Sequence, residues 1–311
     1  MRVRISTAFQ QELSVNAMLT QQTNIAQTQE QMALGLRVVR PSDDPPAAVR
    51  ALILKESIEV NKQYQTNINM AKSRLSLEDS VLDGVVDALQ KLNELGIEAL
   101  NAPLSQKEHD AIDAEVRQVL SQIMDLANTK TDTGEYLFAG LKSTTVPFSG
   151  NAQTGGYTYN GDDQLRYAMI GNGHNINDND PGSKAFTVQS PLAAPTVPPT
   201  TLPPENILNL MFNFAEHLKA SKPDSYDLAN IQLSIRAISG VRVTVGARLA
   251  ALDQQESLNQ KLTTDEKAHL SQTQDLDYTE AVSTLNMQSA ALQAAQQAYA
   301  KVQKLSLFNY F

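Results

Sequence analysis

The stretch from Pro45 to Ala102 constrains the fold more than any other part of the sequence. After Pro46 it contains no proline, and its only glycines are Gly84 and Gly96. A single helix of ~57 residues would be roughly 85 Å long at a rise of 1.5 Å per residue. A compact globule of 311 residues has a radius of gyration of about 20 Å. Whether the stretch forms one helix or two, its length predicts an elongated molecule.

Local signals mark where the helices begin. Asp44 is a favourable N-cap, and Pro45 follows at the first helical position, where its missing N–H costs nothing. The sequence Ser-Gln-Lys-Glu at 105–108 has the spacing of a capping box and predicts a second helix that ends near Asn128. A further proline-free stretch from about residue 224 to 306 predicts another long helical region.

Glycine and proline concentrate in the middle of the chain. Between Gly140 and Pro204 lie 8 of the 14 glycines, and 8 of the 13 prolines lie between Pro147 and Pro204. Alternating residues at 157–159, 165–169 and 186–188 predict short strands, with Asn160-Gly161 as a hairpin turn between the first two. We therefore expect a mainly α fold, an elongated antiparallel helical bundle or coiled coil built from both chain ends, with a small β-rich inserted domain. The expected domains are a terminal coiled coil (1–40 with 271–311), a helical rod (41–140 with 205–270) and the β-rich insert (141–204).

Both chain ends carry a seven-residue apolar repeat, as in a coiled coil, but they carry few of the charged residues that a solvated coiled coil has. The repeats are Met18, Ile25, Met32 and Val39 at one end, and Tyr278, Leu285, Leu292 and Tyr299 at the other. These apolar strips are weak, because Gln22 and Gln29 are expected at inner positions of the first one. Our hypothesis is that both ends are mobile in the free monomer and become helical when subunits pack.

Apolar residues near the ends have too little chain around them to be buried locally. We expect them to contact neighbouring copies or the opposite chain end, and an uncharged outer face suits such contacts. The expected assembly residues are Ile5, Phe9, Met18, Ile25, Met32, Leu285, Leu292, Tyr299, Leu305 and Phe308.

Composition argues against several classes of function. The net charge of −9 comes without a basic stripe, which disfavours nucleic-acid binding. The absence of cysteine excludes disulfides and thiolate metal sites, and no apolar run approaches the ~20 residues of a membrane span. Two arginines near the start are not followed by an apolar block of the signal-peptide kind.

Candidate catalytic and metal-binding residues are sparse. The four histidines have no catalytic or metal-binding spacing. The segment from Asn175 to Gly182 resembles a calcium loop only in part, because Gln189 stands where a bidentate Glu is needed. We interpret it as turn residues of a surface loop. No enzyme activity, cofactor or metal is expected.

Several motifs stand out in the two helical arms of the chain. Residues 35–45 follow the pattern GxRxxxPSDDP, and residues 127–129 and 134–140 read ANT and GEYLFAG. Further motifs lie at residues 245–248, 276–281 and 305–308. In this order, the motifs resemble those of the flagellin superfamily, and within it those of the flagellar hook–filament junction proteins. The resemblance covers roughly residues 1–140 and 205–311, and the insert shows none.

The resemblance implies a structural component of the bacterial flagellum. Such a protein would be exported by the flagellar type III machine, helped by a cytosolic chaperone bound to its C-terminal region. It would form a homo-oligomeric ring at the distal hook–filament junction, on the first junction protein (hook-associated protein 1), and flagellin would polymerise on it. Its location would be extracellular after a transient cytoplasmic stage, with no nucleic-acid or membrane partner. We expect the inter-helix elbow at Gly35, Arg37, Pro41, Ser42, Asp43, Asp44 and Pro45.

Two alternative functions stay open at this point. The first is a short flagellin that forms the filament itself. The second is an adhesin or carbohydrate-binding module in the insert, where Phe148, Tyr157, Tyr159 and Tyr167 could stack on a sugar. The same four aromatics would more simply form the small core of the insert.

Overall fold

The computed structural model confirms the mainly α fold with a small strand-rich insert. It describes the backbone of residues 7–101, 104–192 and 203–308, and the side chains of residues 9, 11–101, 104–192 and 203–301. The chain forms two compact units, residues 1–60 with 261–311 and residues 61–260. The domain boundaries expected from the sequence stay a prediction.

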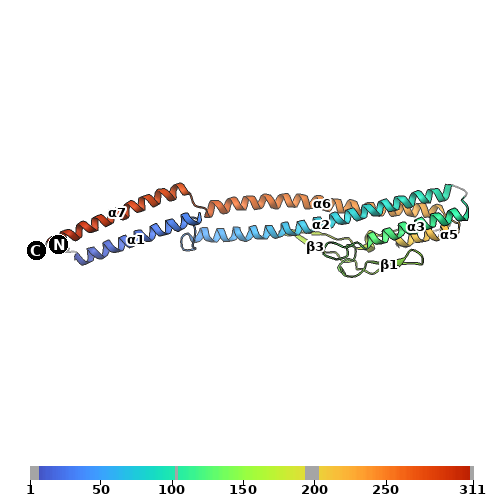
Figure 1. Cartoon of the computed structure of the whole chain (residues 1–311), viewed down its shortest axis with the longest axis horizontal. Helices are drawn as coiled ribbons and strands as arrows, with labels where there is room; N and C mark the ends of the chain where they lie inside the picture. The colour runs from blue at the N-terminus through green and yellow to red at the C-terminus, as the bar shows by residue number, and fades with distance from the viewer. Residues whose placement is uncertain (1–6, 102–103, 193–202, 309–311) are drawn as a thin grey trace. The chain divides into compact units, whose positions relative to one another are not determined.

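The first unit pairs the two ends of the chain. Helix α1 (Thr7–Leu34) lies beside helix α7 (Tyr278–Phe308), drawn in dark blue and red in Figure 1. The two helices are antiparallel, because Gln11 bonds to the hydroxyl of Tyr299 while Gln21 bonds to the carbonyl of Gln288. The predicted pairing of both chain ends is therefore present.

Two very long helices connect the chain ends to the rest of the protein. Helix α2 (Pro45–Asn101) is a single helix of 57 residues, so Gly84 and Gly96 do not break it. Helix α6 (Ser225–Gln274) ends well before residue 306. The expectation of one helical stretch from about 224 to 306 was wrong at residues 275–277, where Asp277 begins a new helix by accepting a hydrogen bond from the N–H of Thr279.

The core of the second unit follows a regular heptad pattern along α2. Buried residues recur at alternating intervals of three and four, which places them on one face of the helix. Helix α3 (Gln106–Ala127) begins at the predicted capping box and lies beside helix α5 (Ile207–Lys219) (Figure 1). The buried residues of α2 that follow this spacing are Ile68, Ala71, Leu75, Glu78, Leu82, Val85, Leu89 and Leu92.

Three small antiparallel sheets, each of two strands, make up the strand-rich part that the structure describes. Strands β1 (Phe148–Asn151) and β2 (Gly155–Tyr159) form the first, and β3 (Tyr167–Gly171) and β4 (His174–Asn177) the second. A short helix, α4 (Gly182–Ala185), precedes the third, formed by β5 (Thr187–Val188) and β6 (Glu205–Asn206).

The predicted hairpin through Asn160-Gly161 was wrong. Strand β2 pairs with β1, which precedes it, and the N–H of Asn160 extends that pairing by donating to the carbonyl of Pro147 at 2.8 Å. The carboxylate of Asp162 then holds the following loop by accepting from the N–H of Leu141 at 2.8 Å. Asn160-Gly161 favours a hairpin turn, but tertiary contacts fix this segment as a loop instead.

Asparagine side chains on the helices dock the strand-rich part. Asn128, the C-cap of α3, both donates to and accepts from the backbone of Phe148, at 3.0 and 2.9 Å. Asn209 of α5 makes the same pair of bonds with Tyr157, both at 3.0 Å. An amide side chain offers one donor and one acceptor in the geometry of a peptide group, so it substitutes for a neighbouring strand at the edge of a two-stranded sheet.

The aromatic residues of the insert divide between core and surface. Phe148 and Tyr157 are buried and Tyr159 is half-buried, which agrees with their interpretation as a small core. Tyr167 instead is 63% exposed, so including it in that core was wrong.

The interpretation of 175–182 as a surface loop was also wrong. Its first residues belong to β4, and Asp178 and Asn179 are buried. Asp178 accepts two hydrogen bonds from the guanidinium of Arg166, at 2.9 and 2.8 Å, and Asp180 pairs with Arg248 of α6. Buried acidic residues need such partners, so these side chains hold the segment against the helices.

Candidate functional site

The elbow, residues 35–45, begins where α1 is stopped by Gly35. This glycine has a φ of +70°, in the left-handed region that favours glycine. The N–H of Leu36 donates back to the carbonyl of Gln31 at 3.1 Å, which closes the last turn of the helix. A Cβ atom at residue 35 would lie 3.3 Å from the hydroxyl of Tyr278. Helix α1 therefore ends directly before Gly35.

Two aspartates then organise the start of α2. Asp43 accepts from the backbone N–H groups of Val39 and Arg40 at 3.2 and 2.8 Å. Asp44 caps α2 by accepting from the N–H of Ala47 at 3.1 Å, and Pro45 occupies the first helical position. These bonds make the loop a fixed turn.

Arg37 links the elbow to the other chain end. Its guanidinium donates to the carboxylate of Asp44 at 3.0 Å and to the carbonyl of Thr273 at 2.9 Å. The bond from Arg37, followed by the bond from the N–H of Ala47, lowers the pKa of Asp44. The carboxylate therefore stays ionised where it caps the helix and holds the arginine.

A second elbow, residues 275–277, lies against the first. The N–H of Arg37 donates to the carbonyl of Gln274 at 2.8 Å, and the N–H of Leu276 donates to the carbonyl of Gly35 at 3.0 Å. The two breaks thus form a short antiparallel bridge between the chain ends. This half of the site was not predicted from the sequence, although Asp277 and Glu280 have the spacing of a capping box.

The remaining elbow residues lie on the surface. Pro41 and Ser42 are exposed at the tip of the turn, and Arg40 pairs with Glu30 of α1 at 2.8 Å. Their role in contacts with another subunit stays a prediction. Beside the elbows is a cavity of about 310 Å³, lined by Arg37, Asp275 and Asp277 among others.

The helix pair of the first unit meets along most of the predicted apolar strips. Two strip residues are exceptions, because Val39 lies beyond the end of α1 and Tyr278 is 53% exposed. Half-buried side chains lie on both helices, and polar residues alternate with them. The expected inner positions of Gln22 and Gln29 were wrong, because both are exposed while Gln21 and Thr28 face inward. Thr28 donates to the side chain of Gln288 at 3.0 Å, which places a polar layer in the pair. The half-buried assembly residues are Met18, Ile25, Met32, Leu285, Leu292 and Tyr299.

Large apolar side chains remain exposed on the same helix pair. Phe9 and Leu19 of α1 are 53% and 55% exposed, and Met287 of α7 is 64% exposed. Of the other predicted assembly residues, Ile5 lies outside the described residues, as do the side chains of Leu305 and Phe308. The described part of the pair thus offers apolar surface that this chain does not cover.

The described residues hold no cluster of three or more acidic, His or Cys side chains placed to bind a metal. In the same part of the chain, each helix is too short or too polar to cross a membrane.

Comparison with known proteins places these features in a family. Residues 5–143 match the family model described as the bacterial flagellin N-terminal helical region. Flagellar hook-associated protein 3 of Salmonella typhimurium is 29% identical over 320 residues, which cover 99% of each chain. The Escherichia coli protein of that name is 30% identical over 326 residues, again 99% of each. The chain belongs to the flagellar hook-associated protein 3 family.

Solved structures agree with the fold of the hook-associated protein 3 family. The structure of flagellar hook-associated protein 3 from Legionella pneumophila aligns with a TM-score of 0.63 at 22% identity, covering 71% of this chain and 98% of that one.

A filament protein matches by sequence over a shorter range. A flagellar filament core protein of Treponema phagedenis is 26% identical, but over only 44% of this chain. The names of these relatives describe components of the flagellum.

Proposed function

We propose that this protein is a structural subunit of the distal hook–filament junction of the bacterial flagellum, on which flagellin polymerises. The observation that carries the proposal is the full-length match to relatives named hook-associated protein 3. The flagellin-type relative named above matches less than half of this chain, which favours a junction subunit over a short flagellin. The role is structural and requires no catalytic group.

The partners follow from that position. Copies of this chain form a ring on the first junction protein, hook-associated protein 1, and the ring presents its other face to flagellin. A cytosolic chaperone holds the C-terminal region before export, and the assembled protein is extracellular. The proposal is supported by the exposed apolar side chains of α1 and α7, because a free chain leaves such surface in water and a neighbouring subunit removes it.

The elbows have a role in this proposal. Gly35 and Asp44 fix the turn between α1 and α2, and Asp277 fixes the turn between α6 and α7. Because both turns are bonded to each other, the helix pair is presented to neighbouring copies as one unit. Because the elbows fix the geometry of the helix pair before assembly, each added subunit loses less conformational entropy when it binds.

Electron microscopy of the purified protein tests the proposal. In salt that polymerises flagellin, we expect no long filaments, and we expect addition to hook ends that already carry hook-associated protein 1. Long regular filaments of this protein alone would identify it as a filament subunit. Failure to add to such hook ends would equally contradict the junction role.

A matched pair of variants locates the assembly surface. Phe9→Ala with Leu19→Ala removes two exposed side chains, and Met169→Ala removes one of similar exposure from β3. Burying one large apolar side chain contributes about 1.5–3 kcal/mol, so the double variant should lower occupancy of hook ends by about tenfold or more. Equal occupancy for the double variant and the control would place the contact elsewhere.

A further inference from the structure

The turn between β3 and β4 has a reactive sequence that the assembly role does not use. Asn172 and Gly173 form this two-residue connection, and asparagine followed by glycine occurs once more, at Asn160-Gly161. Asparagine loses its side-chain amide most readily before glycine, because no side chain keeps the next backbone nitrogen away from the amide carbon. Since the two dipeptides are identical, their surroundings decide which of them reacts.

The chemistry sets three conditions for the structure. The backbone nitrogen of Gly173 would attack the side-chain amide carbon of Asn172, closing a five-membered succinimide ring. The bond from that carbon to Nδ2 breaks, and the nitrogen leaves as ammonia with the proton of the backbone N–H. Water then opens the ring at either carbonyl and leaves aspartate or isoaspartate at position 172. The side-chain amide must therefore be free, the backbone N–H unbonded, and the turn able to rotate.

All three conditions are met at Asn172. Both residues of the turn are exposed, and the side chain of Asn172 makes no hydrogen bond with the described residues. Within the same part of the chain, the N–H of Gly173 donates to no backbone carbonyl. A Cβ atom placed on Gly173 would meet no other atom within 4 Å, so the turn has open space around it.

The same dipeptide at Asn160 is held on every side. Its side-chain amide donates to the hydroxyl of Ser149 at 2.9 Å, and its backbone N–H donates to the carbonyl of Pro147 at 2.8 Å. The following Gly161 is half-buried, and a Cβ atom there would collide with the hydroxyl of Tyr159. These contacts must open before a ring can close at this site.

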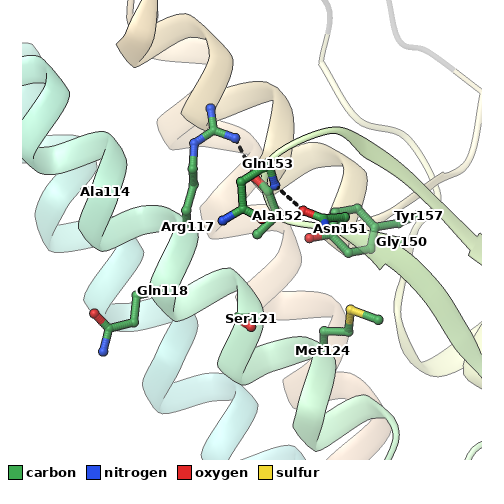
Figure 2. A pocket seen from close by; sticks show the side chains of 10 residues that line it. All are labelled: Ala114, Arg117, Gln118, Ser121, Met124, Gly150, Asn151, Ala152, Gln153 and Tyr157. Carbon is green, nitrogen blue, oxygen red and sulfur yellow. Dashed lines mark hydrogen bonds between the residues drawn. The ribbon is translucent and has the colours of Figure 1, made fainter.

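The turn between β1 and β2 shows how the other hairpin is fastened. In Figure 2 the side chain of Asn151 accepts a hydrogen bond from the N–H of Gln153 at 2.7 Å, and Arg117 of α3 donates to the carbonyl of Ala152. The turn at residues 172–173 has neither kind of bond to any residue that the structure describes. Its exposed asparagine is therefore left to react.

Helix side chains hold the strand that leads into the reactive turn. Asn67 of α2 donates to the carbonyl of Met169 at 2.8 Å, and Asn259 of α6 donates to the carbonyl of Ile170 at 2.9 Å. All of these residues belong to the second unit. A change in the turn therefore acts on a hairpin that is otherwise docked on the helices.

We propose that the fold makes Asn172 a site of spontaneous deamidation, and that the isoaspartate product loosens the β3–β4 hairpin. Isoaspartate routes the main chain through the former side chain, so it adds one methylene to a connection of two residues. Gly171 and His174 are paired across this connection, and the longer chain no longer fits that pairing. The product also carries a negative charge that asparagine lacks.

Peptide mapping of the full-length protein tests the site. Folded protein kept at pH 8 and 37 °C is digested briefly with trypsin, which separates the two dipeptides into peptides 143–166 and 167–184. Replacing an amide by a carboxyl group raises the peptide mass, and fragment spectra assign the change to a residue. Because two hydrogen bonds must open at Asn160, we expect deamidation at Asn172 to be at least about tenfold faster. Equal rates, or a faster reaction at Asn160, would overturn the proposal.

The unfolded chain is the control for the sequence around each site. In concentrated urea both dipeptides lose their contacts, so Asn160 and Asn172 should react at similar rates. If Asn172 kept the same advantage in urea, the neighbouring sequence would select it and the proposal that the fold does so would be wrong.

Amide exchange of fresh and aged protein tests the effect on the hairpin. In aged protein that contains isoaspartate, exchange in β3 and β4 should be about tenfold faster, as expected for the loss of ladder hydrogen bonds. Asn172→Gln would need a less favourable six-membered ring, so its exchange should not change on ageing. Asn172→Asp carries the charge without the extra methylene and should exchange like fresh protein. Unchanged exchange in the isoaspartate form would overturn the proposed loosening.

Discussion

At the scale of single residues, Glu78 is the least expected member of the core. It occupies an inner heptad position of α2 between Leu75 and Leu82, and it is fully buried. Its carboxyl oxygens accept no hydrogen bond from an N–H group of the described residues, and the carboxyl group of Asp180 lies within hydrogen-bonding reach of them. Burial, followed by the nearby charge of Asp180, raises its pKa well above the ordinary value of 4.5, although Arg248 and Arg74 act in the opposite direction. Burial and Asp180 therefore favour the neutral form of this carboxyl group over the ionised form in the folded protein.

This placement predicts that stability falls as pH rises above 4.5. In that range the unfolded chain releases the proton of Glu78 while the folded chain keeps it. The free energy of unfolding therefore falls by at most ~1.4 kcal/mol per pH unit, until the carboxyl group of the folded chain also ionises. Glu78→Gln keeps a neutral side chain of similar shape and should remove this pH dependence. Urea unfolding of the variant and the parent from pH 5 to pH 8 measures the difference, which should grow with pH.

Glu94→Gln is the matched control, because Glu94 is an exposed residue of the same helix. Its stability should follow the parent chain at every pH. A constant difference between Glu78→Gln and the parent would show that Glu78 is not the titrating group.

The heptad positions of Ile68, Leu75, Leu82 and Leu89 are readable in the sequence, because helix periodicity is local. The burial of Glu78 among them cannot be read from the sequence. Its charged neighbours Asp180 and Arg248 come from distant parts of the chain, and only the fold brings them to α2. Periodicity in the sequence can therefore indicate the buried face of the helix, but not the state of the acid within it.

At the scale of elements, the paired elbows determine where the long helices end. The stop at Gly35 and the cap at Asp44 were predictable, since both depend on backbone groups within a few residues. The break at 275–277 was missed because it contains neither glycine nor proline, and the cap at Asp277 was the only local sign. The hairpin predicted at Asn160 failed for the opposite reason. Its local turn signal was strong, but the long-range pairing of β2 with β1 overrode it.

Substitution of Gly35 tests the importance of the first elbow. Gly35→Ala places a Cβ in the left-handed region, which costs roughly 1–2 kcal/mol, and crowds the hydroxyl of Tyr278. We expect a lower urea midpoint and faster amide exchange in the last turn of α1. Gly35→Asn should lose less, because asparagine tolerates the left-handed conformation better.

The control variant for this prediction should change stability in the opposite direction. Gly246 lies exposed inside α6, and a Cβ there meets nothing within 4 Å. Gly246→Ala should therefore stabilise the helix by up to ~1 kcal/mol. If Gly35→Ala were as stable as Gly246→Ala, the left-handed turn at residue 35 would not occur in solution.

At the scale of the whole molecule, the two units bury very different amounts of apolar surface. Along the described side chains of α1 and α7, only Thr28 and Ala281 are fully buried. The second unit instead contains the buried residues of α2, α3, α5 and α6 in one continuous core. Because helix stability in proteins comes mostly from packing, the first unit depends on additional contacts that assembly would supply.

Amide hydrogen exchange in a dilute monomer tests this difference directly. We expect rapid exchange in α1 and α7 and strong protection in the buried part of α2, because opening the terminal pair exposes little apolar surface. When the same protein is added to hook ends, protection of α1 and α7 should rise by at least about tenfold, as neighbouring subunits cover Phe9 and Leu19. Strong protection of α1 already in the monomer would show that its polar layer at Thr28 and Gln288 stabilises the pair without partners, and that assembly is not what orders the chain ends.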